Sequence, residues 1–230
     1  MDKIILSIDT ATGVCSAALS QGDRLLAGYY EEGECNHARL LPLFIADLTN
    51  ELERLHCHPD AVAVSAGPGS YTGLRIGVST AKGLAYGWHV PLIAVPTPEV
   101  LCAALLQRYE PNPQTLLCPM LDARRMEVYA ALYDQHLQIV QEVKPWVVTD
   151  GLLPTEGQVC YFGNGAAKCQ EVLPSDTWHY VDGIQADARV MGALATARLQ
   201  AGKTEDVAYF EPYYLKEFVA APAHVKGLQA

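Results

Sequence analysis

A two-lobed α/β fold is predicted by three features of this 230-residue chain. Half of its residues are apolar, which is enough to build a sizeable core. Short apolar runs typical of strands alternate with longer segments of helical periodicity. The sequence Glu-Pro-Asn-Pro at 110–113 interrupts this alternation and predicts a boundary between lobes. We expect a first lobe at 1–110 joined by a helix near 186–200, a second lobe at 111–185, and a tail at 201–230.

The first lobe is expected to start with a meander of three strands and to continue with alternating helices and strands. Its predicted elements are strands at 4–9, 15–19 and 24–30, a helix at 37–55, a strand at 61–64, a helix at 74–88, a strand at 91–95 and a helix at 98–109. Asn36 and Thr97 are residue types that cap helices, and Pro98 suits a first helical turn.

The helix at 37–55 has a broad apolar surface. Five leucine or isoleucine residues recur with a helical period and should face the core: Leu41, Ile45, Leu48, Leu52 and Leu55. Leu40, Leu43 and Phe44 extend the apolar surface beyond that stripe. A helix that is apolar on two sides must bury both of them, so we expect this helix to have two packing partners.

The second lobe is expected to be smaller and rich in strands. Its predicted elements are strands at 116–121, 127–133, 137–143 and 159–162, followed by a returning helix at 186–199. The tail from 209 onward carries aromatic residues and prolines and should lie over a surface of the protein. A charged turn is either a salt-bridged corner or part of a nucleotide or partner surface; it contains Asp122, Arg124, Arg125 and Glu127.

A glycine-rich loop follows the predicted strand at 61–64. The spacing of Gly67, Gly69 and Gly73 matches neither the dinucleotide-binding pattern nor the phosphate-binding P-loop. The loop is either a tight connection that needs positive φ, or an anion site at a helix N-terminus. The hydroxyl side chains that favour the second interpretation are Ser70, Tyr71 and Thr72.

The helix that follows this loop has a small residue at every fourth position. These residues are Gly73, Gly77, Ala81 and Ala85. A ridge of small side chains allows close approach of another element. That element is either the chain's own sheet or a helix of a partner protein.

Composition narrows the class of protein. The chain has 16 basic and 26 acidic residues, a net charge of −10, which argues against a free-standing nucleic-acid binder. The sequence shows neither a signal peptide nor an apolar run of the roughly 18 residues that a membrane helix needs. Seven scattered cysteines without a C-x-x-C pair are typical of a reducing compartment. We therefore expect a cytoplasmic protein without a membrane segment.

The sequence offers no convincing catalytic constellation. His37, His56 and His58 lack matched partners at metal-ligand spacing, so we expect no metal site and interpret them as solvated or capping residues. The chain has no G-x-S-x-G pattern, so a serine nucleophile of that kind is not expected. A metallopeptidase is disfavoured for the same lack of ligands.

Three separated motifs resemble those of the TsaB (YeaZ) family, whose fold is the actin-like, Hsp70-like ATPase fold (ASKHA). The motifs are IDTAT at 8–12, GPGSYTGLRIG at 67–77 and LDARRMEVY at 121–129, and PYYLK at 212–216 resembles the family's C-terminal motif. The similarity spans nearly the whole chain. It implies an α/β fold with two lobes, of which the second is reduced.

The resemblance also implies a role in making threonylcarbamoyladenosine in tRNAs that read codons starting with A. In that family the protein is the non-catalytic partner of TsaD, which carries the metal and transfers the threonylcarbamoyl group. The ATPase TsaE joins the pair, and tRNA is reached only through the complex. TsaD proteins have a histidine pair where this chain has Thr97 and Leu101, and leucine has no donor atom for a metal.

We expect the two helices at 37–55 and 73–88 to bind TsaD, and to pair with a second copy of the chain when TsaD is absent. The expected interface residues are His37, Leu40, Leu41, Phe44, Leu74, Gly77, Val78 and Ala81. No tightly bound cofactor is expected in the chain alone, and ATP or ADP with magnesium is expected at the TsaD interface.

A weak ATPase or nucleotide sensor of the same fold is the alternative function. Its nucleotide would be held by residues of the first strand and the glycine loop: Asp9, Thr10, Thr12, Gly67, Gly69, Ser70, Tyr71, Thr72 and Gly73. Asp9 would hold Mg²⁺ through water, and the loop would hold phosphate. The reduced second lobe disfavours hydrolysis, because phosphate-binding parts do not supply a group that positions water.

Overall fold

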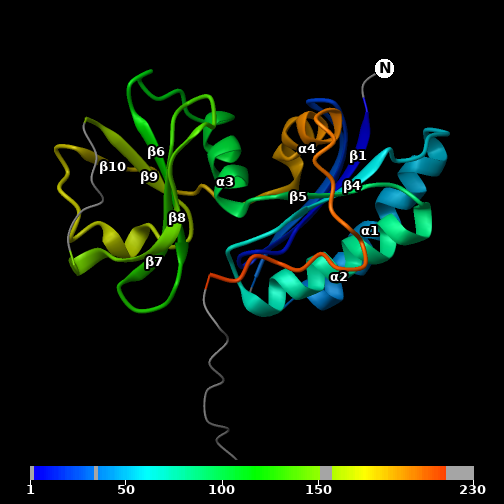
Figure 1. The fold of residues 1–230 in the computed structure, drawn as a ribbon, viewed down its shortest axis with the longest axis horizontal. Helices are drawn as coiled ribbons and strands as arrows, with labels where there is room; N and C mark the ends of the chain where they lie inside the picture. Colours follow the sequence, from blue (N-terminus) through cyan, green and yellow to red (C-terminus); the bar gives the residue numbers. More distant parts are fainter. Residues whose placement is uncertain (1–2, 34–35, 151–156, 216–230) are drawn as a thin grey trace, which may run out of the picture.

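The computed structural model describes residues 3–33, 36–150 and 157–215. Two five-stranded sheets form two lobes that lie side by side (Figure 1). The strands of the first sheet, in the order β3-β2-β1-β4-β5, are β1 (Ile4–Asp9), β2 (Val14–Gln21), β3 (Arg24–Glu32), β4 (Ala61–Ser65) and β5 (Leu92–Val95). Those of the second, in the order β10-β9-β6-β7-β8, are β6 (Leu116–Asp122), β7 (Glu127–Tyr133), β8 (Ile139–Val147), β9 (Val159–Phe162) and β10 (Trp178–Tyr180).

Four α-helices in the described part of the chain cover these sheets. They are α1 (His37–Arg54), α2 (Tyr71–Trp88), α3 (Thr97–Leu106) and α4 (Gly192–Gln200), and the 3-10 turns are η1 (Val148–Asp150), η2 (Ala167–Cys169) and η3 (Ala188–Val190). In the first sheet β1 pairs antiparallel with β2 and parallel with β4, so the meander continues into a parallel half. In the second sheet β6 likewise pairs antiparallel with β7 and parallel with β9.

Three clusters of buried side chains form the core of the described residues, and one of them joins the two lobes. One face of the first sheet packs against α1 and α2, where Leu41, Val64 and Val78 are buried together. The opposite face packs against α3 and α4, and this cluster continues into the second sheet through Leu121 and Phe162. A third cluster fills the outer face of the second sheet. Because α3 lies between the sheets, one continuous core joins the lobes (Figure 1).

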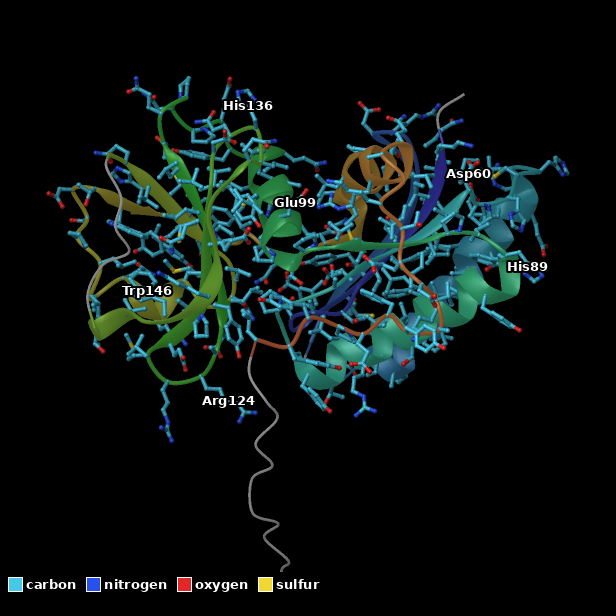
Figure 2. The ribbon with its side chains drawn as sticks, viewed as in Figure 1. Asp60, His89, Glu99, Arg124, His136 and Trp146 are labelled. Atoms are coloured by element: carbon cyan, nitrogen blue, oxygen red, sulfur yellow. The ribbon has the colours of Figure 1, made fainter. Side chains whose placement is uncertain are left out.

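An ion pair adds to this junction. Arg198 on α4 donates from Nη1 to Oε1 of Glu99 on α3 at 3.0 Å, and both side chains are largely buried. Figure 2 shows Glu99 between the two lobes. This ion pair therefore joins α4 to α3 at the lobe junction.

Most predicted strands are confirmed, with shifts at a few ends. The ranges of β1, β7 and β9 agree with the prediction. The strand predicted at 137–143 begins later, at Ile139, because Oδ1 of Asp134 accepts hydrogen bonds from the N–H groups of His136 and Gln138 and holds them in a turn. β10 was not predicted, since three residues are too few to show a periodicity.

The helix predicted at 186–199 is shorter than expected. It is split into η3 and α4. The N–H of Ala188 donates to Oγ of Ser16 on β2 at 2.9 Å, and a Cβ added at Gly192 would lie 2.4 Å from Oγ of Ser20. Contacts with β2 therefore fix the first turn in a conformation that the local sequence does not indicate.

Two details of α1 also differ from the prediction. Asn36 stands at the N-cap position, but its side chain makes no capping hydrogen bond. Leu55 is 39% exposed because the helix ends one residue earlier, whereas Leu41, Leu48 and Leu52 are buried as predicted. Cys35 and Lys216, which belong to the predicted cysteine set and C-terminal motif, lie outside the described residues.

The described cysteines are free thiols, and five of them are buried. Burial raises the pKa of the Cys102 and Cys118 thiols well above the ordinary range. These residues pack as small apolar side chains, as the sequence predicts. In the ranges that the structure describes, no helix has the length and apolarity to cross a membrane.

Candidate functional site

The glycine loop connects β4 to α2 and positions the N-terminus of that helix. Oγ of Ser70 accepts a hydrogen bond from the N–H of Gly73 at 3.2 Å. This cap starts the helix at Tyr71, three residues before the predicted start at Leu74. The N–H of Ser70 donates to the carbonyl of Ala11 at 2.7 Å, so the loop is held against the turn between β1 and β2.

The glycines of this loop make room for the chain's own backbone. A Cβ at Gly69 would lie 2.3 Å from the carbonyl oxygen of Ala11, and one at Gly73 would lie 2.1 Å from that of Thr10. Gly67 has φ of +107°, and its Cβ would lie 2.6 Å from the carbonyl oxygen of Tyr213. Gly67 therefore fits a tight connection with positive φ, the first of the two interpretations open from the sequence, whereas Gly69 and Gly73 are explained by close packing against the chain's own backbone.

Asp9 is enclosed at the end of β1. It has no exposed surface, and its two carboxylate oxygens accept hydrogen bonds from the N–H of Ala11 and the hydroxyl of Ser65. Burial raises the pKa of Asp9 from 3.8 to about 6, although these hydrogen bonds oppose the increase, and the charge of Asp187 adds to it. A carboxylate in this position does not fit a magnesium ion held through water.

The predicted nucleotide residues separate into two groups. Asp9, Thr10 and Gly67 lie behind the surface, and the hydroxyl of Thr10 donates to the carbonyl of Gly73 at 2.7 Å. The others line an open cleft of about 840 Å³ between the two lobes: Thr12, Gly69, Ser70, Tyr71, Thr72 and Gly73. The residues present therefore do not form a magnesium-nucleotide site of the expected kind, although part of the set faces a cavity.

The second lobe supplies the other wall of this interlobe cleft. Leu121, Asp122, Arg124 and Tyr129 line it from β6, β7 and the turn between them. Figure 2 shows Arg124 at the tip of that turn. Lys168 forms an ion pair with Asp122, so the charged turn is a salt-bridged corner that also borders the cleft.

The segment 204–215 forms a strap along the first lobe, toward the cleft (Figure 1). Nζ of Lys82 on α2 donates to the carbonyls of Ala208 and Phe210 at 3.2 and 2.9 Å. The N–H of Tyr213 donates to the carbonyl of Ala66 at 2.7 Å, and the ring of Tyr214 packs 5.0 Å from that of Tyr71. The predicted placement of the tail over a surface is confirmed for its described part.

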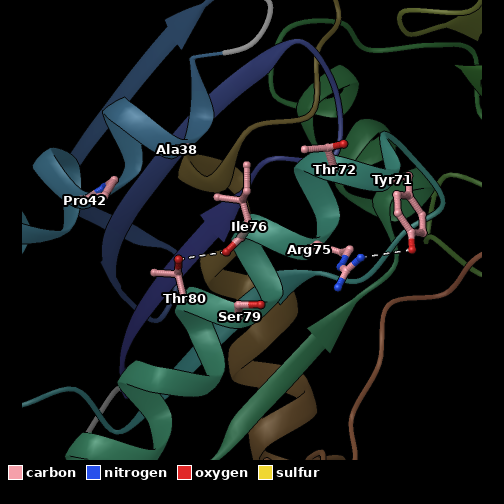
Figure 3. A pocket seen from close by; sticks show the side chains of 8 residues that line it. All are labelled: Ala38, Pro42, Tyr71, Thr72, Arg75, Ile76, Ser79 and Thr80. Atoms are coloured by element: carbon pink, nitrogen blue, oxygen red, sulfur yellow. Dashed lines mark hydrogen bonds between the residues drawn. The ribbon is translucent and has the colours of Figure 1, made fainter. Parts of the chain in front are cut away.

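A second cavity, of about 540 Å³, lies on the outer surface between α1 and α2 (Figure 3). We call it the α1–α2 groove; it is lined by Ala38, Pro42, Tyr71, Thr72, Arg75, Ile76, Ser79 and Thr80. Arg75 donates to the hydroxyl of Tyr71 at 3.2 Å. Tyr71 and Arg75, which lie in this groove, are of residue types that are enriched in protein interfaces.

The predicted interface residues differ in their access to this surface. Six are buried within the chain itself: His37, Leu41, Leu74, Gly77, Val78 and Ala81. A Cβ at Gly77 would lie 2.3 Å from Oγ1 of Thr10, so the small-residue ridge of α2 packs on its own lobe. That ridge is therefore not available to a partner in this conformation.

The accessible part of the predicted surface lies on α1. Leu40 and Phe44 are partly exposed, and the Phe44 ring stacks 5.3 Å from that of Tyr29. Leu43 is 55% exposed, whereas the sequence predicts it only as part of the broad apolar surface of the helix and not as an interface residue. Its position two residues from the buried Leu41, on the opposite side of the helix, is the signal that identifies it as exposed.

Thr97 and Leu101, at the positions of the TsaD histidine pair, are both fully buried. Oγ1 of Thr97 accepts a hydrogen bond from the N–H of Gly67 at 3.2 Å, so Thr97 helps to hold the glycine loop in place. Within 3–33, 36–150 and 157–215, no three His, Cys, Asp or Glu side chains gather in an arrangement suited to a metal ion.

Two sheets packed against helices, a strand-loop-helix at the junction and a cleft between lobes define an α/β protein of the actin-like (ASKHA) type. The chain matches the family model described as TsaD, tRNA N6-adenosine threonylcarbamoyltransferase, over residues 31–153. It is 33% identical over 226 residues to the tRNA threonylcarbamoyladenosine biosynthesis protein TsaB of Escherichia coli (strain K12), covering 94% of this chain and 96% of that one. The chain belongs to the TsaB family.

Other relatives agree with this assignment. The TsaB of Bacillus subtilis (strain 168) is 36% identical over 142 residues, which cover 61% of this chain and 59% of that protein. The solved structure of YeaZ from Pseudomonas aeruginosa is similar with a TM-score of 0.78 and 26% identity, covering 92% of this chain and all of that one. A second structure, described as an uncharacterized protein with similarity to peptidase YeaZ from Pseudomonas aeruginosa, has a TM-score of 0.81 at 24% identity, covers 93% of this chain and all of that one, and supports the fold.

Proposed function

We propose that this chain is the non-catalytic subunit that binds and supports TsaD in the biosynthesis of tRNA threonylcarbamoyladenosine. Membership of the TsaB family supports the role in this modification. The observations that carry the partner role are the α1–α2 groove and the exposed Leu43 on α1. The reaction served is transfer of the threonylcarbamoyl group to the adenosine next to the anticodon.

The proposed docking surface consists of the outer sides of α1 and α2. Leu40, Leu43 and Phe44 supply apolar contact area, and the groove accepts side chains from the partner. A specific interface buries about 1,200–2,000 Å² in total, so TsaD would cover both helices over most of their length. In the absence of TsaD, the same surface would pair two copies of this chain about a two-fold axis.

The proposed mechanism is conformational support. The inner side of α2 packs on β1 through Gly73 and Gly77, so its outer side is a rigid platform. Docking on such a platform would hold the active site of TsaD in a competent arrangement. Any ATP or ADP with magnesium at that interface would take its metal ligands from TsaD, because Asp9 is enclosed. TsaE would join this pair, and tRNA would be reached through the complex.

The test is light scattering after size-exclusion chromatography of the chain alone and mixed with TsaD from the same source. The expected result is a homodimer that is replaced by a heterodimer. Leu43→Glu should weaken TsaD binding by about 2 kcal/mol, roughly thirtyfold, since it places a charge in the interface. Leu43 is exposed, so the variant should fold.

The matched control is Val172→Glu, the same kind of change at a side chain that is 40% exposed in the second lobe. It should leave TsaD affinity unchanged. Phe44→Asp should also abolish binding, but its ring stacks on Tyr29, so its folding must be checked by thermal unfolding. The proposal would be contradicted if the chain did not bind TsaD under any nucleotide condition. It would also be contradicted if the Leu43→Glu and Val172→Glu variants had equal affinities for TsaD.

A further inference from the structure

The turn between β6 and β7 carries two adjacent arginines that the fold itself does not use. Arg124 and Arg125 are both exposed, and Figure 2 shows Arg124 at the end of this turn, pointing away from the strands. Among the residues that the structure describes, neither guanidinium has an ion-pair or hydrogen-bond partner. On a chain with a net charge of −10, the pair is a local positive patch that acidic neighbours do not neutralise.

The backbone at both positions is unfavourable for arginine. Arg124 has φ of +70° and Arg125 has φ of +51°. An L side chain in this region costs free energy that glycine avoids and that asparagine tolerates. Such conformations persist chiefly where a functional side chain must be held in place. The turn alone would favour glycine or asparagine, so the reason for arginine lies in its side chain.

Hydrogen bonds hold the base of this turn. The N–H of Arg124 donates to Oδ1 of Asp122 at 3.1 Å, and the N–H of Glu127 donates to the carbonyl of Arg124 at 3.2 Å. Nζ of Lys168 pairs with Asp122 and donates to the carbonyl of Glu127 at 2.7 Å. Lys168 therefore neutralises the carboxylate nearest to the arginines. A turn held in this way loses little backbone freedom when its side chains bind a partner.

The arginine pair lies at the margin of the proposed docking surface. Arg124 lines the interlobe cleft, whose opposite wall contains Tyr71 and Thr72. These two residues also line the α1–α2 groove. A molecule held by TsaD on that groove would therefore be within reach of the turn. The substrate of the proposed reaction is a tRNA, and a guanidinium group matches a backbone phosphate with two parallel hydrogen bonds.

We propose that Arg124 and Arg125 contact the phosphate backbone of the tRNA while TsaD holds it. The inference rests on the proposed function, because the chain alone is too acidic to bind RNA. Within the complex TsaD would supply the main affinity. At physiological salt, exposed charges more than about 8 Å from a contact are largely screened, so the acidic remainder of the chain does not cancel the local attraction.

The experiment is a fluorescence anisotropy titration of a labelled tRNA that reads codons starting with A. It is titrated with the complex of the full chain and TsaD from the same source, at salt concentrations from about 50 to 200 mM. The variant is Arg124→Asn with Arg125→Asn. At the lowest salt it should bind tRNA about five- to tenfold more weakly, and the slope of log affinity against log salt should fall by about 1.5, or 0.7–0.9 for each phosphate contact.

Three controls separate a phosphate contact from a structural effect. Replacing both arginines by lysine keeps the charges and should leave the salt slope unchanged. Arg24→Asn removes an exposed arginine between β2 and β3, near the start of β1 and at the other end of the first sheet from the glycine loop, and should leave tRNA affinity unchanged. The double asparagine variant should unfold at the wild-type temperature or above it, because asparagine tolerates positive φ.

The affinity of each chain for TsaD is measured separately by calorimetry, and the double asparagine variant should match the wild type. Weaker binding of this variant to TsaD would assign the arginines to an acidic surface of TsaD and overturn the RNA contact. Equal tRNA affinity and equal salt slope for the wild-type and double asparagine complexes would also overturn it. Failure of the wild-type chain to bind TsaD at all is a different result, which would remove the proposed function and this inference with it.

Discussion

Asp9→Asn should change how the stability of this protein depends on pH. Asp9 has no exposed surface, and burial raises its pKa from 3.8 to about 6. The folded state therefore holds the proton of Asp9 more tightly than the unfolded state does. The stabilisation is fully present below about pH 4 and is lost as the pH rises through about pH 6.

The magnitude follows from the two pKa values. The increase in pKa from 3.8 to about 6 corresponds to about 3 kcal/mol in the free energy of unfolding, because each pKa unit is worth about 1.36 kcal/mol. Asparagine has the same shape as aspartate and cannot ionise. The Asp9→Asn variant should therefore lack this pH dependence and, above about pH 7, gain up to about 3 kcal/mol relative to the wild-type chain.

The assay is urea unfolding of both chains at a series of pH values from about 4 to 8. The quantity compared is the difference between the two free energies of unfolding at each pH, since other groups contribute equally to both. Parallel curves for the two chains would refute the reasoning. Asp60→Asn is a control with the opposite sign. Burial raises the pKa of Asp60, but the hydrogen bonds from Lys3 and Ile4 outweigh burial and lower it. The stabilisation that Asp60 contributes is therefore lost as the pH falls.

Gly69→Ala should lower the free energy of unfolding by about 2 kcal/mol or more, because the added Cβ would lie 2.3 Å from the carbonyl oxygen of Ala11. Gly83→Ala should stabilise the chain by about 0.5–1 kcal/mol, since Gly83 is helical and faces open space, and thermal unfolding of both glycine variants measures the two effects. Arg198→Met should cost about 1–3 kcal/mol in urea unfolding because it leaves Glu99 partly buried without its partner. A cost below a few tenths of a kcal/mol would show that this ion pair does not stabilise the lobe junction.

Much of the candidate site could be located from the sequence. The positions of the glycine loop, the two helices beside it and the charged turn after β6 all follow from local patterns. The sequence could not predict whether a given side of a helix packs against the chain itself or stays open to a partner. Gly73 and Gly77 form a ridge that suits a partner helix equally well, and only the position of Thr10 shows that the chain itself covers it.

His37 illustrates the same limit. Its place at the start of a helix suggests a solvated residue, yet contact with Thr12 makes it a buried residue facing a cleft. The cleft itself joins residues from the glycine loop, the β6–β7 turn and the strap, which are far apart in the chain. No local pattern contains the information that brings these three segments together.

Local sequence was sufficient for the elements whose residues carry a clear period or a clear turn. β1, β7 and β9 agree with their predicted ranges because alternating or continuous apolar runs depend on neighbouring residues alone. The split of the last helix and the enclosure of Asp9 depend on contacts with β2 and β4 that are distant in sequence. Burial and hydrogen-bond partners are properties of the assembled core, so they became visible when the sheets and helices were packed together.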